Sequence, residues 1–232
     1  MSLFSKWFGR GHSLAHSHEA QLERYHATTQ PKRSTALCRQ RMVVVDVETS
    51  GLAPARDALL AIGAVAIEDG VIRLDQSLEV LLRQDHASAD HNILIHGISG
   101  SVQLGASEPA DALIAFLSFA RKDPLVAYHA DFDRIAIERA VRLVFGIRLK
   151  NLWLDLALLA PALDAGHTAG YALDEWLRVY GIDNDSRHNA LADAVSTAEL
   201  FLVQLSRADA GGLQTCADLE RLQKDQRWLQ RR

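Results

Sequence analysis

The stretch Val43-Val44-Val45-Asp46-Val47-Glu48-Thr49-Ser50-Gly51-Leu52 decides the fold. Its valines, followed by a Thr-Ser-Gly break, are typical of a buried β-strand. Side chains of a strand alternate between its two faces, so Asp46 and Glu48 are expected on the same face. Two carboxylates on an apolar strand are costly to bury alone, and a divalent cation such as Mg²⁺ or Mn²⁺ removes that cost. The alternative is a strand end with two solvated acids.

The composition favours one α/β domain with extensions. The chain has 232 residues, of which 48% are hydrophobic, and its formal net charge is −4. Residues 1–41 contain seven basic and two acidic residues, so the remainder has a net charge of −9. That acidic remainder argues against a broad electrostatic DNA-binding face. It still permits a nuclease whose acids hold metal ions, because the ions supply positive charge at the site.

Cysteine content and hydropathy favour a cytoplasmic protein. Cys38 and Cys216 are far apart, and two cysteines cannot build a cysteine-rich zinc site or a disulfide framework. A reducing cytosol is therefore the expected compartment. The first residues lack the apolar run of a signal peptide, and no segment reaches the length needed to span a membrane.

The hydrophobic pattern divides the chain into three parts: a basic N-terminal arm (1–40), an α/β domain (41–206) and a C-terminal helical tail (207–232). Strands are predicted at 42–48, 59–67, 71–82, 124–128 and 152–155, and helices at 108–121, 132–145, 171–180 and 189–206. Asp69-Gly70 between two apolar runs indicates an antiparallel hairpin. The order predicts a mixed sheet, an antiparallel meander plus parallel strands, flanked by helices. This is the layout of the ribonuclease H-like fold.

Two further segments place chemistry-bearing side chains at element ends. Phe132-Asp133 lies between a predicted strand and its helix, where ligands of α/β sheets collect. His188 precedes the last long helix, and Asp193 lies five residues beyond it. Asp193 does not belong to the apolar face of that helix, so the sequence does not determine where its side chain points.

Together, Asp46-x-Glu48, Phe132-Asp133 and His188-x4-Asp193 resemble the three motifs of the DEDDh 3′→5′ exonucleases. That family includes the proofreading epsilon subunit of bacterial DNA polymerase III, ribonuclease T and oligoribonuclease. The resemblance covers roughly residues 42–205. It implies hydrolysis of phosphodiester bonds at single-stranded 3′ ends with release of nucleoside 5′-monophosphates.

The resemblance also implies roles for five residues. Asp46, Glu48, Asp133 and Asp193 would hold two divalent cations, Mg²⁺ or Mn²⁺, as phosphodiester cleavage by paired metals requires. His188 would take the proton from the attacking water. Histidine suits this role because it ionises near neutral pH.

For substrate binding, the family implies that Thr49 and the nearby backbone hold the terminal 3′-hydroxyl. Leu52 would wedge against the last base, and His96 would lie near the terminal nucleotide. Ordinary packing is the alternative for Leu52 and His96. Many family members have His-Asn-Ala before the Phe-Asp motif, whereas this chain has Tyr128-His129-Ala130. A role borrowed from that asparagine is therefore in doubt.

Three functional hypotheses remain open at this stage. The first is an exonuclease that acts on single-stranded DNA, which the similarity to the epsilon group favours. A DNA polymerase subunit is a possible partner of such an enzyme, but the resemblance does not decide this. The second is an RNA exonuclease of the oligoribonuclease or ribonuclease T type. The third is a nucleic-acid-binding module without catalysis. Digestion of matched DNA and RNA oligonucleotides with and without metal separates them.

Overall fold

A computed structural model describes residues 16–164, 166, 171–184 and 186–230 of the chain. A five-stranded mixed sheet in the order β3-β2-β1-β4-β5 forms its centre. The strands are β1 (Met42–Thr49), β2 (Leu59–Glu68), β3 (Val71–Leu81), β4 (Leu125–Ala127) and β5 (Trp153–Asp155). The first three strands form an antiparallel meander, and β4 and β5 extend the sheet in parallel from β1. The mixed sheet predicted from the sequence is confirmed.

Strand β1 is buried on both faces because two hydrophobic cores meet at the sheet. Val43, Val45 and Val47 belong to the core beneath α4 (Pro109–Ala120) and α5 (Asp131–Phe145). Val44 belongs to the opposite core, which includes residues of α8 (Ala190–Ala210). The even-numbered positions of β1 therefore face α8. Asp46 and Glu48 continue that even series, so the fold directs them to the α8 side.

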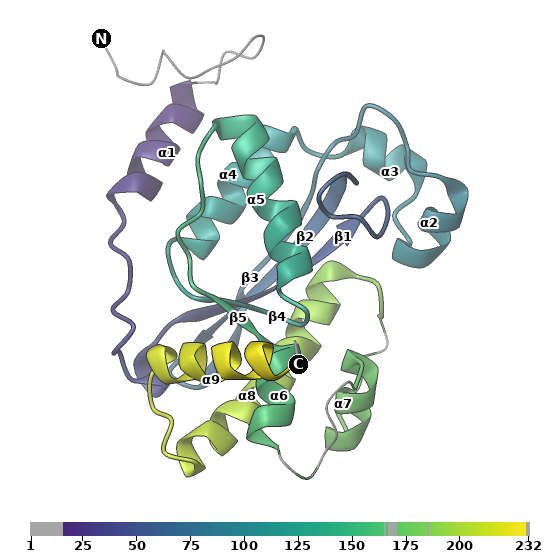
Figure 1. Cartoon of the computed structure of the whole chain (residues 1–232). Coiled ribbons are helices and arrows are strands. Elements are labelled where there is room, and N and C mark those ends of the chain that lie inside the picture. Colours follow the sequence, from purple (N-terminus) through teal and green to yellow (C-terminus); the bar gives the residue numbers. More distant parts are fainter. Residues whose placement is uncertain (1–15, 165, 167–170, 185, 231–232) are drawn as a thin grey trace.

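Helices cover both faces of the sheet (Figure 1). Helices α1 (His16–Ala27), α4 and α5 cover one face. The other face carries α6 (Leu156–Leu163), α7 (Leu173–Tyr180), α8 and α9 (Cys216–Leu229). Two short helices, α2 (Asp90–His96) and α3 (Gly100–Gly105), lie in the segment that the sequence left without an assignment. The predicted last helix continues beyond residue 206 to Ala210.

Both extensions pack on the central domain. Tyr25 of α1 is 5% exposed and belongs to the same core as α4. A β-bridge joins Ala36 to Thr215, so the segment after α1 contacts the segment before α9. The division into arm, domain and tail stays a prediction, and residues 1–15 lie outside the described residues. Within the described part of the chain, no helix is both long enough and apolar enough to cross a membrane.

Candidate active site

Asp46 and Glu48 lie near the C-terminal end of β1, where the strand leaves the apolar core. Asp46 is opposite Gly63 of β2 in the antiparallel register. A Cβ atom at Gly63 would lie 2.1 Å from the backbone carbon of Ala190. Glycine is therefore required here, because the first residue of α8 rests directly on the strand. This close approach brings the N-terminus of α8 to the two carboxylates.

The start of α8 is held in this position by side-chain hydrogen bonds. The Asn189 side chain accepts a hydrogen bond from the Ala192 N–H at 2.9 Å and completes the helix N-terminus. The Asn189 amide also donates to Glu79 Oε1 of β3 at 2.7 Å. Helix α8 is thus fastened to the sheet edge immediately after His188.

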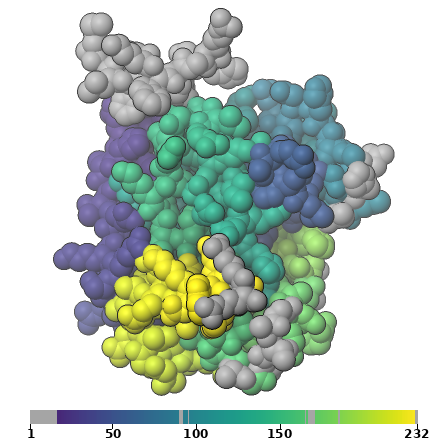
Figure 2. All heavy atoms as spheres, in the orientation of Figure 1, coloured from purple at the N-terminus to yellow at the C-terminus, as the bar shows by residue number. Residues whose placement is uncertain are grey.

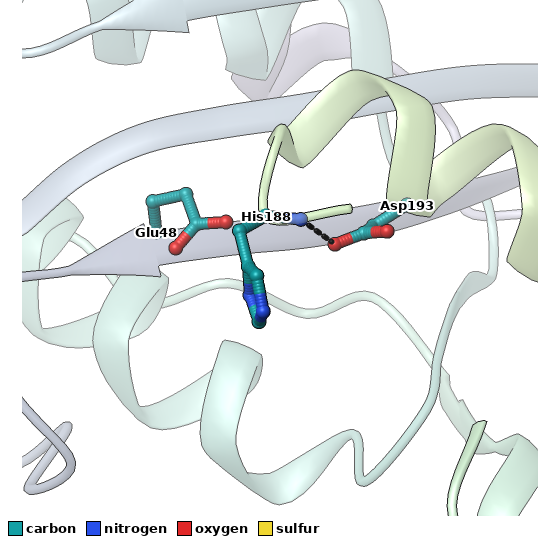
Figure 3. Close-up of side chains that lie close together, drawn as sticks. All are labelled: Glu48, His188 and Asp193. Atoms are coloured by element: carbon teal, nitrogen blue, oxygen red, sulfur yellow. Dashed lines mark hydrogen bonds between the residues drawn. The ribbon is translucent and has the colours of Figure 1, made fainter. Parts of the chain in front are cut away.

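Glu48, His188 and Asp193 form one cluster (Figure 3). Each offers a ligand atom, and these atoms lie within 4.8 Å of one another. The His188 backbone N–H donates to Asp193 Oδ2 at 3.1 Å, whereas its imidazole extends away from that contact. His188 has φ +66°, in the left-handed region. Asn, Asp and His tolerate this backbone conformation better than other residues with a Cβ atom.

Asp193 is 4% exposed and fully engaged with donors. Besides His188 N–H, its carboxylate accepts from Asn184 Nδ2 at 2.6 Å and from Arg187 Nη1. The Arg187 guanidinium also contacts Asp174 of α7, with 2.7 Å between Nε and Oδ1. Arg187 therefore places positive charge inside the acidic cluster.

Asp133 lies in the first turn of α5 and is 3% exposed. Burial raises the pKa of its carboxyl well above the usual value, and repulsion from Asp46 adds to the shift. A backbone hydrogen bond from Val47 acts in the opposite direction. Asp133 thus lies beside the end of β1, and the four acids named by the sequence motifs meet at one place.

Burial and mutual repulsion together raise the pKa values of the acids in the cluster. Burial raises the pKa of Asp46 to about 8, with a further contribution from Asp193. The pKa of Glu48 also rises to about 8, first through burial and then through repulsion from Asp46 and Asp193. Arg187 lowers both values. Carboxylates that are buried close to one another have the donor chemistry of a divalent-cation site.

The cluster opens into a pocket of about 830 Å³. Asp46, Glu48, His188 and Asp193 line it on one side, and Phe132 lines it beside Asp133. The loop after β1 and helix α2 line the other side. The pocket is large enough for a nucleotide, and its volume lies in the range expected of small-molecule sites.

All three residues expected to bind substrate, Thr49, Leu52 and His96, line the pocket. Leu52 lines the pocket with 91% of its side chain exposed, although it is a large apolar residue. The Thr49 hydroxyl donates to the Gly51 carbonyl at 2.6 Å, which leaves its oxygen able to accept. His96 also lines the pocket, but it is 4% exposed.

The two ring nitrogens of His96 already have partners. Nδ1 accepts from the Ile98 N–H at 3.0 Å, and Nε2 pairs with Ser88 Oγ at 3.1 Å. Burial lowers the pKa of His96, so the ring is held neutral. Its position therefore supports packing of the wall at least as well as direct recognition of a nucleotide.

Sequence reasoning missed Arg187 and Asn184 as parts of the site. Arg187 directly precedes His188, and that adjacency was a usable signal. Asn184 carried no comparable signal, because its contact with Asp193 depends on the path of the loop between α7 and α8. Asp131, two residues before Asp133, is exposed and pairs with Arg134 at 2.9 Å, so it lies apart from the acidic cluster's hydrogen bonds.

The fold and the acidic pocket at the strand ends define an α/β protein of the ribonuclease H-like class. A family model described as exonuclease (RNase_T) matches residues 43–201. The chain belongs to this exonuclease family.

Curated relatives carry the names of replication enzymes. A DNA polymerase III subunit epsilon-like protein of Rhodobacter capsulatus is 34% identical over 184 residues, which covers 78% of this chain and 26% of the relative. A PolC-type DNA polymerase III of Thermotoga petrophila is 29% identical and covers 78% of this chain. The chain spans about a quarter of the first relative and 13% of the second. The epsilon subunit of Aquifex aeolicus, 25% identical, is matched over 78% of its own length.

Solved exonuclease structures share the fold. Exonuclease X in complex with 5′ overhanging duplex DNA has a TM-score of 0.61 at 20% identity, covering 78% of this chain and 99% of the other. Escherichia coli exonuclease I in complex with a dT13 oligonucleotide has a TM-score of 0.59 at 16% identity, covering 74% and 42%. These similarities confirm the ribonuclease H-like architecture.

Proposed function

We propose that this protein is a metal-dependent 3′→5′ exonuclease of the DEDDh type that removes nucleoside 5′-monophosphates from single-stranded DNA ends. The observation that carries the proposal is the meeting of Asp46, Glu48, Asp193 and His188 at the mouth of one pocket. The proposed substrate is DNA because the relatives are named as DNA polymerase III proteins. Those names also support proofreading beside a DNA polymerase as the biological setting.

The residues present fit a pair of divalent cations, Mg²⁺ or Mn²⁺. Asp46, Glu48 and Asp193 offer clustered oxygen donors, with Asp133 beside Asp46. Burial and repulsion between the acids raise the pKa values of Asp46 and Glu48, which supports a site that gains from added positive charge. Such ions, when bound, supply the positive charge that a reacting phosphodiester needs.

The remaining steps belong to side chains of this chain. We assign to the His188 imidazole the removal of a proton from the attacking water, because the ring extends from the cluster into the pocket. Thr49 Oγ1 would accept a hydrogen bond from the terminal 3′-hydroxyl of the substrate. Leu52 would pack against the last base. The Asp193 carboxylate, which pairs with Arg187, would also serve as a ligand of the cation.

The deciding experiment uses a single-stranded DNA oligonucleotide labelled at the 5′ end, with Mg²⁺ or Mn²⁺. A 3′→5′ exonuclease yields a ladder of progressively shorter labelled products. Chelator or Asp46→Asn should abolish the ladder. A labelled mononucleotide as the first product would contradict the direction, and cleavage that persists in chelator would contradict the metal requirement.

Two further outcomes separate the alternatives. Faster digestion of a matched RNA oligonucleotide would assign the enzyme to the RNA exonucleases. Binding of the DNA oligonucleotide without any shortening, in the presence of either metal, would show a binding module instead.

A further inference from the structure

A second concave region lies on the outer side of α5, apart from the acidic pocket. It has a volume of about 370 Å³ and is lined by Ala55, Ile135, Glu138, Arg139, Arg142 and Arg148. Three of these six side chains are arginines and one is acidic. On a chain whose residues beyond 41 have a net charge of −9, this concentration of positive charge is a local exception. We call it the arginine groove.

Positive charge exceeds negative charge along this groove, because its lining residues include three arginines and one acid, Glu138. Among the described residues, the ion pairs include none made by Arg139, Arg142 or Arg148. The acid in the groove, Glu138, lies 3.7 Å from Arg134 instead. Arg142 and Arg148 are exposed, so their guanidinium groups are available to a ligand. Arginine suits phosphate because its planar fork donates two parallel hydrogen bonds.

The groove and the acidic pocket share one loop. Leu52 and Asp57 of that loop line the acidic pocket, and Ala55 between them lines the groove. The Arg139 guanidinium donates to the Asp57 carbonyl and so joins α5 to the loop. Figure 2 shows the surface of this loop, in blue, against the blue-green surface of α5. A strand that left the pocket across this loop would reach the groove next.

We infer that the arginine groove binds backbone phosphates of the nucleic acid strand on the 5′ side of its terminal nucleotide. This inference rests on the proposed function, which places the 3′ end in the acidic pocket. Arg139 lies six residues beyond Asp133 on α5, about 9 Å along the helix axis at ~1.5 Å per residue. With ~3.4 Å per nucleotide in a stacked strand, the groove meets phosphates roughly three or more nucleotides from the end.

The groove would also offset the repulsion between the acidic pocket and a negatively charged strand. The pocket itself is lined by acids, and an approaching polyanion is repelled until cations are bound. Arginines that contact the strand outside the pocket supply attraction without competing for those cations. Their contribution to affinity must therefore depend on salt and on the length of the strand.

The test compares the wild-type chain with the double variant Arg142→Ala/Arg148→Ala. Binding is measured by fluorescence anisotropy on a single-stranded DNA of about 20 nucleotides, protected by phosphorothioate linkages, over a series of salt concentrations. Hydrolysis of an unprotected dinucleotide, too short to reach the groove, is measured in parallel. The matched control is Arg73→Ala/Arg221→Ala, which removes two arginines that line neither the groove nor the pocket.

For the double variant we expect the affinity for the long strand to fall about ten- to thirtyfold near 0.1 M salt, and the slope of log K against log salt to flatten by about 1.4. Dinucleotide hydrolysis should stay at the wild-type rate, and the control should bind like wild type. Unchanged affinity and slope in the double variant would overturn the inference, as would an equal loss in the control.

Failure of the proposed function has a different signature. If wild type does not hydrolyse the dinucleotide, the assigned activity is wrong. The binding comparison involves no turnover and still decides whether the groove contacts the strand.

Discussion

Two histidines at the site have left-handed backbone conformations, His129 at φ +59° and His188 at φ +66°. Asparagine, aspartate and histidine tolerate this region better than other residues that carry a Cβ. His129 stands where many exonucleases of the resembling family have asparagine. The backbone conformation is compatible with that departure, because histidine and asparagine both tolerate it.

A substitution at His188 separates its chemical role from its backbone role. His188→Asn keeps a residue that tolerates the left-handed region but removes the imidazole. We expect the turnover number to fall about 10²- to 10⁴-fold, while the free energy of unfolding changes by less than about 0.5 kcal/mol.

The companion variant His188→Val loses the imidazole and also strains the backbone, because a β-branched residue is unfavourable at positive φ. It should be less stable than His188→Asn by about 1 kcal/mol or more in chemical denaturation. Full activity in His188→Asn would rule out the imidazole as the proton acceptor.

At the scale of elements, the contact between β2 and α8 assembles the site. Gly63→Ala would place a methyl group 2.1 Å from the backbone of Ala190. We expect a loss of about 1–3 kcal/mol in the free energy of unfolding, because neither backbone segment can yield easily. Displacement of His188 and Asp193 by about 1 Å should lower the turnover number about a hundredfold.

The control for this prediction is Gly105→Ala in α3. A Cβ at Gly105 would have no neighbour within 4 Å. Both stability, by denaturant titration, and exonuclease rate should remain at wild-type levels. A Gly63→Ala protein as stable and active as wild type would mean that α8 can move away from the sheet without consequence.

Helix α9 protects the open edge of the sheet at β5. Gln223 Oε1 accepts from the Asp155 N–H at 2.9 Å, and Nε2 donates to the Trp153 carbonyl at 3.0 Å. The side chain thus takes the place of a neighbouring strand, since an unpaired strand edge otherwise has unsatisfied backbone groups. The hydrophobic pattern of residues 207–232 indicated a helix but not this contact.

Gln223→Met should therefore destabilise the protein by about 2–4 kcal/mol, because it leaves a buried donor and acceptor of β5 without partners. Lys224→Met, at an exposed neighbouring position, is the matched control and should change stability by less than about 0.5 kcal/mol. Urea denaturation measures both. Equal stability of the two variants would show that β5 does not depend on α9.

The hydrophobic pattern did not predict the two helices between β3 and α4. These are α2 and α3, of seven and six residues. Helices of one or two turns are too short to show a reliable 3.6-residue period, and they depend on tertiary contacts. Gln103 supplies such a contact: it is 1% exposed, and its side-chain amide donates to the Ile98 carbonyl at 2.8 Å.

At the scale of the whole molecule, the buried acids make the metal-free protein sensitive to pH. Asp46 and Glu48 have pKa values of about 8, against ordinary values of 3.8 and 4.5. The folded state therefore holds these protons to higher pH than the unfolded chain. The free energy of unfolding should fall as pH rises from about 5 to about 8, because the unfolded state loses its protons first.

Denaturant titrations in chelator at several pH values test this prediction. Asp46→Asn should weaken the dependence of the free energy of unfolding on pH, because it removes one of the two carboxyl groups whose pKa is raised. Under the proposed function Mg²⁺ would bind the ionised carboxylates, so its stabilising effect should grow over the same pH interval. A metal-free protein that gains stability as pH rises through this interval would contradict the assigned pKa shifts.

The sequence by itself determined the local features: a buried strand with Asp46 and Glu48 on one face, the Asp69-Gly70 turn, and the long helices. These follow from alternation, turn chemistry and helical period, which act between near neighbours in the chain. Tertiary structure alone decided that α8 rests on Gly63, that Arg187 pairs with Asp193, and that α9 covers β5. The contacts of Gly63 and of β5 join residues far apart in sequence, and the Arg187–Asp193 pair depends on the path of the loop before α8. All three depend on how packed elements meet, so they leave no periodic trace in the chain.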